Sequence, residues 1–455
     1  MNNQTPSWDA FVKRGSQVEL ATYLIELWGG KENAVWDGGF YTYNSEEHLW
    51  EERSHEACKH DIQTFDGRDF GDPRTHSDGS TTRKRITVND GMCNSVLSLA
   101  RAQITRRIFV KDPHFFDDAP FGVLCNGVFL HAKHAQVCAE PCKSMHRQRV
   151  KLNIDYAQDA HAPLWTKALE GWFGSDKDGM EKRALLAQFV GGALFGLATR
   201  YQKALFIVGG GGNGKSQLLD VVESLFPNDF KAAIEPQKWS DSYSRDQLRG
   251  VRLNRVNEIP AKTITGGSDF KAIITGDPIS AREIYHSPYS YRPRAAHIFT
   301  ANELPGSTDI TNGFWRRVMI LPMTKRFDGT SEDIPELGQK IIASEMQGVL
   351  AWAVEGARRL LEQDRYTIPV SSLDAVQDWR DSCDPLGQWL NERTTAAKNK
   401  HERTRTNALF QDWQTWSQGE FQPKSARGFS LKLKKRFGRP HRSNGGSLFP
   451  LMLKA

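Results

Sequence analysis

The sequence predicts an α/β protein with a sheet between helices, preceded by an α+β segment and followed by a basic segment. Three observations lead to this fold class. An apolar strand at 206–208 runs into a glycine-rich loop, and the loop opens a helix. Short strand and helix patterns then alternate as far as residue 324, which is typical of layered α/β folds. The segment 391–455 is rich in lysine and arginine.

Length and composition indicate a globular protein of several domains. A chain of 455 residues corresponds to two to four domains of about 100–200 residues each. No apolar run approaches the roughly 20 residues of a membrane helix. Residues 1–12 lack the charged and apolar regions of a secretory signal. We therefore expect a cytoplasmic protein without a membrane partner.

The six cysteines are too few to predict a disulfide framework in a chain of this length. Five possible metal ligands nevertheless lie three or four residues apart: His131, His134, Cys138, Cys142 and His146. They could form a zinc site or simply belong to a polar loop. The spacing lacks the paired ligands of common zinc folds, which favours the polar loop.

The segment before residue 200 mixes strand and helix patterns. Residues 66–82 are rich in Gly, Asp, Ser and Thr and predict a loop. Strands are expected at 108–110 and at 122–130, where an Asn-Gly pair predicts a hairpin turn. Helices are expected at 163–173 and 183–199, separated by a polar break at 174–179.

The glycine-rich loop has the spacing G-x-x-x-x-G-K-[ST] of a phosphate-binding P-loop. Glycines allow positive φ angles, so that backbone N–H groups turn toward phosphates, and the helix N-terminus adds donors. Lys215 can reach the β- and γ-phosphates, and the Ser216 hydroxyl can bind Mg²⁺. The expected nucleotide-binding residues are Gly209, Gly210, Gly211, Gly212, Asn213, Gly214, Lys215, Ser216 and Gln217.

Polar residues that flank later strands are candidates for hydrolysis. Glu258 follows the strand pattern 251–257 and could activate water; the alternative is a surface glutamate. Asn302 ends an apolar strand and could bind the γ-phosphate; the alternative is an ordinary turn residue. Arg316 and Arg317 could stabilise the transition state of a neighbouring subunit as an arginine finger, or form a surface charge pair.

The C-terminal part combines helices with strong positive charge. Residues 335–363 predict a helix, and 365–385 are less regular and predict a linker. Helices at 408–416 and 429–437 precede the hairpin signal Asn444-Gly445-Gly446, an order compatible with a winged helix. Residues 391–455 hold 14 basic and 4 acidic side chains, a local net charge of +10 that predicts a nucleic-acid partner.

The motifs occur in a characteristic order: GGGGNGKS, the strand ending at Glu258, FKAIITGDPISAR at 270–282, the strand ending at Asn302, and WRR at 315–317. This order resembles the superfamily 3 helicases, in particular their phage/plasmid and poxvirus primase-helicase branch. Weaker flanking matches resemble the domain that precedes the helicase core in that branch: Asn126-Gly127-Val128, Tyr156, Pro163, Trp165 and Gly174. The resemblance covers the chain from about Gly38 to its end.

The resemblance implies an AAA+-like fold and a ring, usually a hexamer, that moves along DNA with ATP and Mg²⁺. It gives Lys215 and Ser216 the Walker A role, Glu258 the Walker B role and Asn302 that of sensor 1. The finger is Arg316 or Arg317, and we prefer Arg317 at this point. No paired-acid polymerase motif precedes the helicase segment, so the expected activity is helicase without primase.

The family also has a hairpin that points into the central pore, at the place of residues 282–291 here. Arg282, Tyr285 and His286 are then the expected DNA-binding residues, since charge and aromatic stacking hold single strands. The alternative is a hairpin whose tyrosines pack into the core. The family often has two acids in Walker B, whereas Asn257 precedes the single acid here and Asn254 and Arg255 interrupt the strand.

The expected domains are an N-terminal α+β domain (1–180), the ATPase (181–335), a helical linker (336–385) and a basic winged-helix-like domain (386–455). The function predicted first is an ATP-dependent DNA helicase for replication of a phage, plasmid or other mobile element. The departure at Asn257 leaves open an origin-binding initiator that is gated by nucleotide and does not unwind processively. A small-molecule kinase or another unrelated P-loop enzyme is disfavoured by the basic tail and the late arginine pair.

Overall fold

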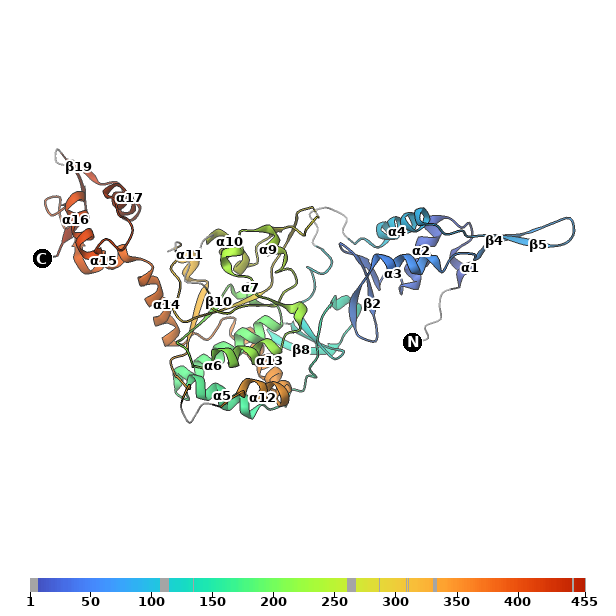
Figure 1. The fold of residues 1–455 in the computed structure, drawn as a ribbon, viewed down its shortest axis with the longest axis horizontal. Helices are drawn as coiled ribbons and strands as arrows, with labels where there is room; N and C mark the ends of the chain where they lie inside the picture. The colour runs from blue at the N-terminus through green and yellow to red at the C-terminus, as the bar shows by residue number, and fades with distance from the viewer. Residues whose placement is uncertain are drawn as a thin grey trace.

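The computed structural model describes residues 7–106, 114–133, 135–259, 267–285, 287–307, 309, 311–329, 334–443 and 446–454. A central part holds the largest sheet, an N-terminal part extends to one side, and the C-terminal part lies beyond α14 on the other (Figure 1). None of the helices in these ranges has the length and apolar character that crossing a membrane requires.

The N-terminal part packs helices against a small antiparallel sheet of order β1-β2-β3. Buried side chains of α2 and α4 form the centre of its own core. The helices are α1 (Trp8–Phe11), α2 (Gln17–Leu27), α3 (His55–Gln63) and α4 (Asp90–Ile104), and the strands are β1 (Ala34–Trp36), β2 (Phe40–Asn44) and β3 (Leu49–Arg53).

The prediction of a loop at 66–82 is wrong, because most of this segment forms a two-stranded ribbon. Strands β4 (Asp69–Thr75) and β5 (Thr81–Arg85) pair antiparallel and project from the N-terminal part (Figure 1). Every side chain of β5 is exposed. The sequence shows no alternating apolar pattern here because neither face is buried, so backbone pairing alone defines these strands.

A second sheet, of order β8-β7-β6-β9, connects the N-terminal and central parts. The hairpin predicted at 122–130 is confirmed: Asn126 and Gly127, both with positive φ, join two of its strands. The strand expected at 108–110 lies outside the described residues. The elements are β6 (Gly122–Cys125), β7 (Val128–Lys133), β8 (Gln136–Pro141), the 3-10 turn η1 (Ser144–His146) and β9 (Lys151–Leu152).

Helices α5 (Pro163–Phe173) and α6 (Lys177–Leu194) lead to the central sheet. The first has the predicted bounds. The second begins six residues before the predicted start, since the Asp176 carboxylate caps it by accepting from the Gly179 N–H at 2.8 Å. The break predicted at 174–179 is therefore shorter, and α7 (Ala198–Tyr201) is a separate helix.

The central sheet is parallel with strand order β11-β12-β15-β10-β16. This confirms a mixed α/β architecture around a parallel sheet. Its strands are β10 (Ala204–Val208), β11 (Lys231–Ala232), β12 (Leu253–Val256), β15 (Ala296–Ala301) and β16 (Val318–Pro322). Between them lie α8 (Lys215–Ser224), η2 (Asn228–Phe230), η3 (Pro236–Lys238), α9 (Ser242–Asp246), α10 (Gly267–Thr275), β13 (Ile279–Ala281), β14 (Tyr289–Tyr291) and α11 (Asn312–Trp315).

Strand β10 is buried on both faces, as parallel strands usually are. Leu205 and Ile207 face a core that includes α6 and α13 (Met346–Gln363), whereas Phe206 faces a second core of aromatic residues. Helices α6 and α13 touch closely: a Cβ at Gly191 would lie 2.1 Å from the Ala353 carbonyl oxygen, so only glycine fits there.

The segment after the sheet is more regular than predicted. The helix expected at 335–363 is divided into α12 (Leu337–Ser344) and α13. The prediction of an irregular linker at 365–385 is wrong, since most of this segment forms α14 (Val370–Ser382). Trp379 of this helix is buried in the aromatic core, and its indole N–H donates to the Pro305 carbonyl at 2.7 Å.

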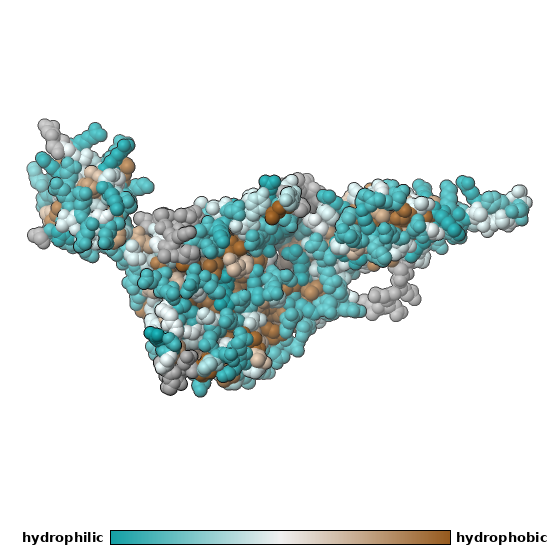
Figure 2. All heavy atoms as spheres, in the orientation of Figure 1, coloured by the Kyte–Doolittle hydropathy of each residue, from teal (hydrophilic) through white to brown (hydrophobic). Residues whose placement is uncertain are grey.

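The C-terminal part has its own small core around Trp389 and Trp413. Its helices are α15 (Pro385–Arg393), α16 (Thr406–Ser417) and α17 (Ala426–Phe437), and its strands are β17 (Thr394–Ala396), β18 (Thr404–Arg405), β19 (His441–Ser443), β20 (Gly446–Phe449) and β21 (Leu451–Leu453). Strands β19 and β20 pair antiparallel, as the glycine signal predicts. Hydrophilic atoms cover most of the visible face here and on the N-terminal part (Figure 2).

Candidate functional site

The carboxyl edge of the central sheet gathers most of the predicted catalytic residues. The glycine loop 209–214 follows β10, Asn302 follows β15, and Glu258 lies two residues after β12. These strands are parallel, so their carboxyl ends meet at one edge. The chain leaves β10 toward β11 on one side, and later crosses to β16 on the other. Ligands of open α/β sheets bind at such a change of direction.

The glycine loop owes its conformation to two positive φ angles and two close approaches. Gly212 has φ 71° and Gly214 has φ 80°. A Cβ at Gly209 would lie 2.2 Å from the Met323 carbonyl oxygen, to which the buried Asn213 amide donates at 2.9 Å. A Cβ at Gly214 would lie 2.3 Å from the Trp172 indole nitrogen. These positions therefore require glycine.

The Lys215 ammonium lies within the curve of the loop. It donates to the Gly209 carbonyl at 2.6 Å, the Gly210 carbonyl at 2.8 Å and the Asn302 side-chain oxygen at 3.2 Å. Partial burial lowers the pKa of Lys215, while the nearby Glu258 carboxylate acts in the opposite direction. The position of this cation suits an anionic ligand held by the loop.

Glu258 and Asn302 lie next to this lysine. The Asn302 amide donates to Glu258 Oε1 at 3.5 Å, so Asn302 lies between the ammonium and the carboxylate. The Glu258 backbone has φ 52°, an uncommon conformation for a non-glycine residue. Its N–H donates to the Thr300 hydroxyl at 2.8 Å, which fixes that conformation. The structure therefore brings together Lys215, Asn302 and Glu258, as predicted.

The polar residues within β12 do not interrupt the strand, contrary to the prediction. Asn254 is buried and bonds both the N–H and the carbonyl of Ile234. Arg255 pairs with Asp220 at 2.9 Å and with Glu223, which ties β12 to α8. The Asn257 side chain accepts from Arg255 Nε at 2.9 Å. Each of these polar side chains thus has a hydrogen-bond partner, so the strand can contain it without being interrupted.

The residues expected to hold Mg²⁺ are Ser216, in the first turn of α8, and Glu258. In the described part of the chain, no group of three His, Cys, Asp or Glu side chains is arranged to bind a metal. Mg²⁺ at phosphate sites needs only one or two protein ligands, because phosphates and waters supply the others. A hydroxyl and a carboxylate are donor types that this ion accepts.

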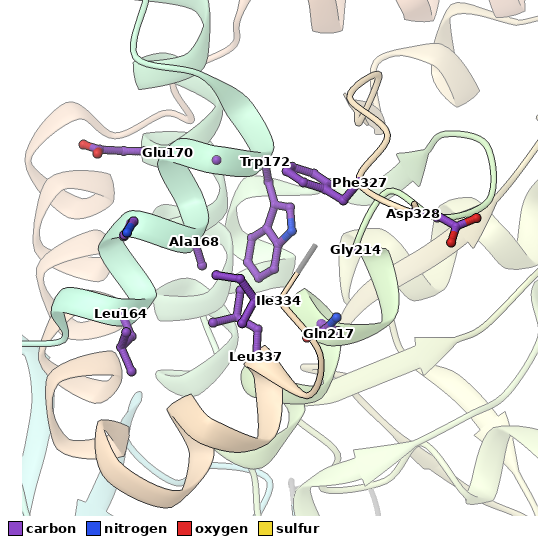
Figure 3. A pocket seen from close by; sticks show the side chains of 13 residues that line it. Leu164, Ala168, Glu170, Trp172, Gly214, Gln217, Phe327, Asp328, Ile334 and Leu337 are labelled. Atoms are coloured by element: carbon purple, nitrogen blue, oxygen red, sulfur yellow. The ribbon is translucent and has the colours of Figure 1, made fainter. Parts of the chain in front are cut away.

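An apolar cavity of about 650 Å³ lies beside the glycine loop. The Trp172 indole lies at its centre, with Phe327 on one side and Ile334 and Leu337 on the other (Figure 3). Gly212, Gly214 and Gln217 also line it, so the loop and α8 form one wall. Its volume and apolar lining are those of a small-molecule site.

The two arginines lie at the opposite edge of the sheet, just before β16. Arg317 is 7% exposed and donates to the Thr275 hydroxyl at 2.7 Å and the Gly313 carbonyl at 2.5 Å. Arg316 is exposed. Both arginines therefore lie away from Lys215 and Glu258 in this chain, and Arg316 is the one whose side chain is free to extend outward.

Strands β13 and β14 form the predicted hairpin. Tyr289 and Tyr291, at its base, face inward and bond Asp246 and the Arg245 carbonyl, so the core-packing alternative holds for these two. Tyr285, at the tip, is 98% exposed and has φ 65°. Arg282 is exposed as well, and His286 lies outside the described residues.

The candidate zinc ligands do not lie in one polar loop, because His131 belongs to β7 and Cys138 to β8. The His131 and His146 rings both contact Glu140 Oε1, at 3.0 and 3.4 Å. The Cys142 thiol donates to the His48 carbonyl at 3.6 Å, and burial raises its pKa to about 11, which keeps it protonated. Cys138 lies opposite His131 in the β7–β8 pair, and His134 lies outside the described residues.

Two residues of this site, Thr300 and Trp172, have no signal in the sequence that marks their roles. Thr300, which fixes the Glu258 backbone, has the pattern of an ordinary strand residue. Trp172 could be placed on the apolar face of its predicted helix, but nothing in the sequence connects it with Gly214, 42 positions later. Only the packing of α5 against the loop shows this contact.

Comparisons with known proteins give distant similarities. Residues 207–317 match a family of unknown function, DUF5906. The "Putative helicase L207/L206" of Acanthamoeba polyphaga mimivirus is 24% identical over 203 residues. That match includes 43% of this chain and only 20% of the viral protein. Two solved apo structures of the NrS-1 C-terminal region have TM-scores of 0.41 at 14% identity, each covering 63% of this chain and 65% or 66% of theirs.

Proposed function

We propose that this protein is an ATP-dependent DNA helicase of the superfamily 3, AAA+-like type that works as a ring in the replication of a mobile element. The observation that carries the proposal is the contact series Lys215, Asn302 and Glu258 at the end of the glycine loop. The similarity to a mimivirus protein named as a helicase adds support, over less than half of the chain.

In this proposal the glycine loop binds the phosphates of ATP and the apolar cavity beside it binds the base. Trp172 and Phe327 give that cavity aromatic surfaces for the base, next to Gly214 (Figure 3). Ser216 and Glu258 would hold Mg²⁺, which would neutralise charge on the phosphates. Glu258 orients the attacking water and accepts its proton, and Asn302 contacts the γ-phosphate.

The ring is proposed because one subunit does not provide every charge that hydrolysis requires. Arg316 is exposed at the sheet edge opposite the glycine loop, so it can only serve the nucleotide of a neighbouring subunit. An arginine supplied in this way stabilises charge on the transferred phosphoryl group. We propose a hexamer, the usual ring of the family that the motifs resemble.

DNA contacts are proposed at two places. The hairpin tip, with Arg282 and the exposed ring of Tyr285, would contact single-stranded DNA in the pore. His286, next to Tyr285 in the sequence, is proposed as a third contact. The C-terminal part, proposed as a winged-helix domain at 386–455, would contact the duplex or fork through its basic residues. Its helix α17 has Lys434, Lys435 and Arg436 in the last turn.

One observation favours a second candidate function. The Asn257 side chain is bound to Arg255, and Glu258 is the acid beside Lys215. A site with one acid could turn over slowly and act as a switch. The protein would then be a nucleotide-gated, origin-binding initiator without processive unwinding.

The proposal is tested by measuring ATP turnover, with and without single-stranded DNA, together with strand displacement on a forked duplex. We expect DNA to stimulate turnover, and Lys215→Ala to reduce turnover at least 100-fold, the scale of removing a phosphate-stabilising cation. The exposed Lys177, at the start of α6, gives the matched control Lys177→Ala, which should retain activity.

The outcomes separate the two candidates. Turnover without displacement supports the initiator, and displacement by Lys215→Ala at the normal rate contradicts both functions. Equal melting temperatures of Lys215→Ala and the unmodified protein would show that the fold is intact.

A further inference from the structure

A second cavity, of about 510 Å³, lies between the N-terminal part and the central sheet. One wall comes from β2, β3 and residues 116–119 and 147–150, and the other from residues 229–230, 249–252 and 292–294. Arg252 directly precedes β12, and Arg294 precedes β15 by two residues. The cavity is therefore at the amino ends of these strands, opposite the edge that holds the glycine loop.

Positive charge dominates this cavity. Four carboxylates line it: Glu51, Glu52, Asp117 and Asp229. Six arginines line it as well: Arg147, Arg149, Arg249, Arg252, Arg292 and Arg294. Burial raises the pKa of Asp117, which weakens its contribution of negative charge. The lining thus has an excess of guanidinium groups in a partly enclosed space.

Three of these arginines donate hydrogen bonds to backbone carbonyls in the walls of the cavity. Arg147 donates to the carbonyls of Phe115 and Asp118 and to the Asp118 carboxylate. Arg294 donates to the carbonyls of Asp117 and Ala119, both at 2.7 Å, and Arg292 donates to that of Gly276 at 3.1 Å. The Arg294 bonds connect the N-terminal segment to the central part, whereas those of Arg147 and Arg292 each stay within one wall of the cavity.

The other three arginines stack on aromatic rings. The guanidinium carbon of Arg149 lies 4.6 Å from the Phe116 ring centre, that of Arg249 lies 4.9 Å from Tyr289, and that of Arg252 lies 5.4 Å from Phe230. Stacking fixes the plane of a guanidinium and leaves its N–H groups at the edge available to bind an anion.

Two nitrogen atoms of this set are buried and lack hydrogen-bond partners within the described chain: Arg252 Nη1, which packs against Gly196 outside the cavity lining, and Arg249 Nε. Arg252 is only 6% exposed. Burial, and then the like charge of Arg294, lower the pKa of Arg252 to about 9. A buried cation near a second cation is costly unless an anion compensates it.

We propose that this cavity is a binding site for phosphate groups, separate from the glycine loop. Arginine forks match phosphate oxygens in geometry and charge, and the volume accommodates more than one phosphate. The phosphates could belong to a free polyphosphate or nucleotide, or to the backbone of single-stranded DNA. The site does not depend on the proposed ATPase activity.

The test uses the full-length protein with Lys215→Ala, so that the glycine loop contributes less to phosphate binding. Affinities for inorganic pyrophosphate and for a ten-nucleotide oligothymidylate are measured at constant ionic strength. Arg149→Gln and Arg249→Gln are each expected to weaken the binding of at least one probe about tenfold or more. Arg365→Gln, an exposed arginine that does not line the cavity, is the matched control and should bind as before.

The two probes distinguish the sources of phosphate. Loss of pyrophosphate binding alone identifies a small anion, and loss of oligonucleotide binding identifies the DNA backbone. A second measurement uses protein in which the cavity arginines are unchanged. It follows the rate at which phenylglyoxal modifies Arg149 and Arg249, and the bound probe should slow this rate severalfold. Affinities within twofold of Arg365→Gln for both probes, with no protection of either arginine, would overturn the proposal.

Discussion

The carboxyl edge of the central sheet and the β13–β14 hairpin differ in how far bonds within the chain hold their polar and aromatic side chains in place. At the sheet edge, Lys215, Asn302 and Glu258 are already in contact, and Thr300 fixes the Glu258 backbone. At the hairpin tip, the Tyr285 side chain is 98% exposed. Bonds within the chain hold the first region in place, whereas the second exposes an aromatic side chain to solvent.

This difference agrees with the different roles that we propose for the two regions. Groups that act on a reacting bond must be held by neighbours, because small displacements reduce catalysis strongly. A residue that contacts successive bases of a strand gains from freedom and from an open aromatic face. Arg316 resembles the hairpin tip in this respect, since it is exposed while Arg317 beside it is buried and bonded.

The largest expected difference is between the two arginines. Arg316→Ala should reduce ATP turnover at least tenfold with little change in melting temperature, because its side chain is exposed and would act on the next subunit. Arg317→Ala should instead lower the free energy of unfolding by about 1–3 kcal/mol, since it removes the bonds to Thr275 and Gly313. Turnover assays and thermal unfolding measure the two effects.

Mixing two inactive variants sharpens this prediction. Arg316→Ala subunits retain Lys215, and Lys215→Ala subunits retain Arg316, so a mixed ring contains some complete sites. Turnover should therefore increase when the two proteins are mixed. No recovery in mixtures that form common oligomers would contradict a site shared between subunits.

A smaller effect is expected at the hairpin tip. Tyr285→Ala should weaken single-stranded DNA binding by about 1–3 kcal/mol, which is the range for loss of one stacked base. Tyr285→Phe retains the ring and should bind as the unmodified protein does. Fluorescence anisotropy with an oligonucleotide measures both affinities, and equal affinities of the Ala and Phe variants would exclude stacking by this residue.

The last of these predictions concerns the stability of the central sheet as a function of pH. Burial lowers the pKa of His297, in β15, from its ordinary value to about 3. The unfolded chain therefore takes up a proton near pH 6.5 that the folded protein does not bind. The resulting contribution to stability is complete above pH 6.5 and is lost as the pH falls toward 3, by up to about 1.4 kcal/mol per pH unit.

Denaturant unfolding between pH 4 and 7 measures this slope. His297→Gln should unfold with a smaller dependence on pH than the unmodified protein, and His401→Gln, at an exposed position, should keep the original dependence. Identical slopes for His297→Gln and the unmodified protein would show that His297 is not buried in its neutral form.

The sequence predicts the elements around the loop well because their signals are local. Glycine spacing and the apolar strand specify β10, the loop and α8, and parallel order then brings Asn302 and Glu258 to the same edge. The ribbon β4–β5 could not be predicted, because neither of its faces is buried and its sequence has no periodic pattern of apolar residues. The roles of Trp172 and Thr300 depend on contacts between distant segments, which a single sequence does not record.

The most direct test of the central claim measures ATP binding and ATP turnover in Glu258→Gln. Glutamine keeps the size of the side chain but removes its charge and its ability to accept a proton. We predict ATP affinity within threefold of the unmodified protein and turnover reduced at least 100-fold, with Glu46→Gln, at an exposed position far along the chain, unchanged in both. Normal turnover by Glu258→Gln would contradict the assignment of this sheet edge as the catalytic site.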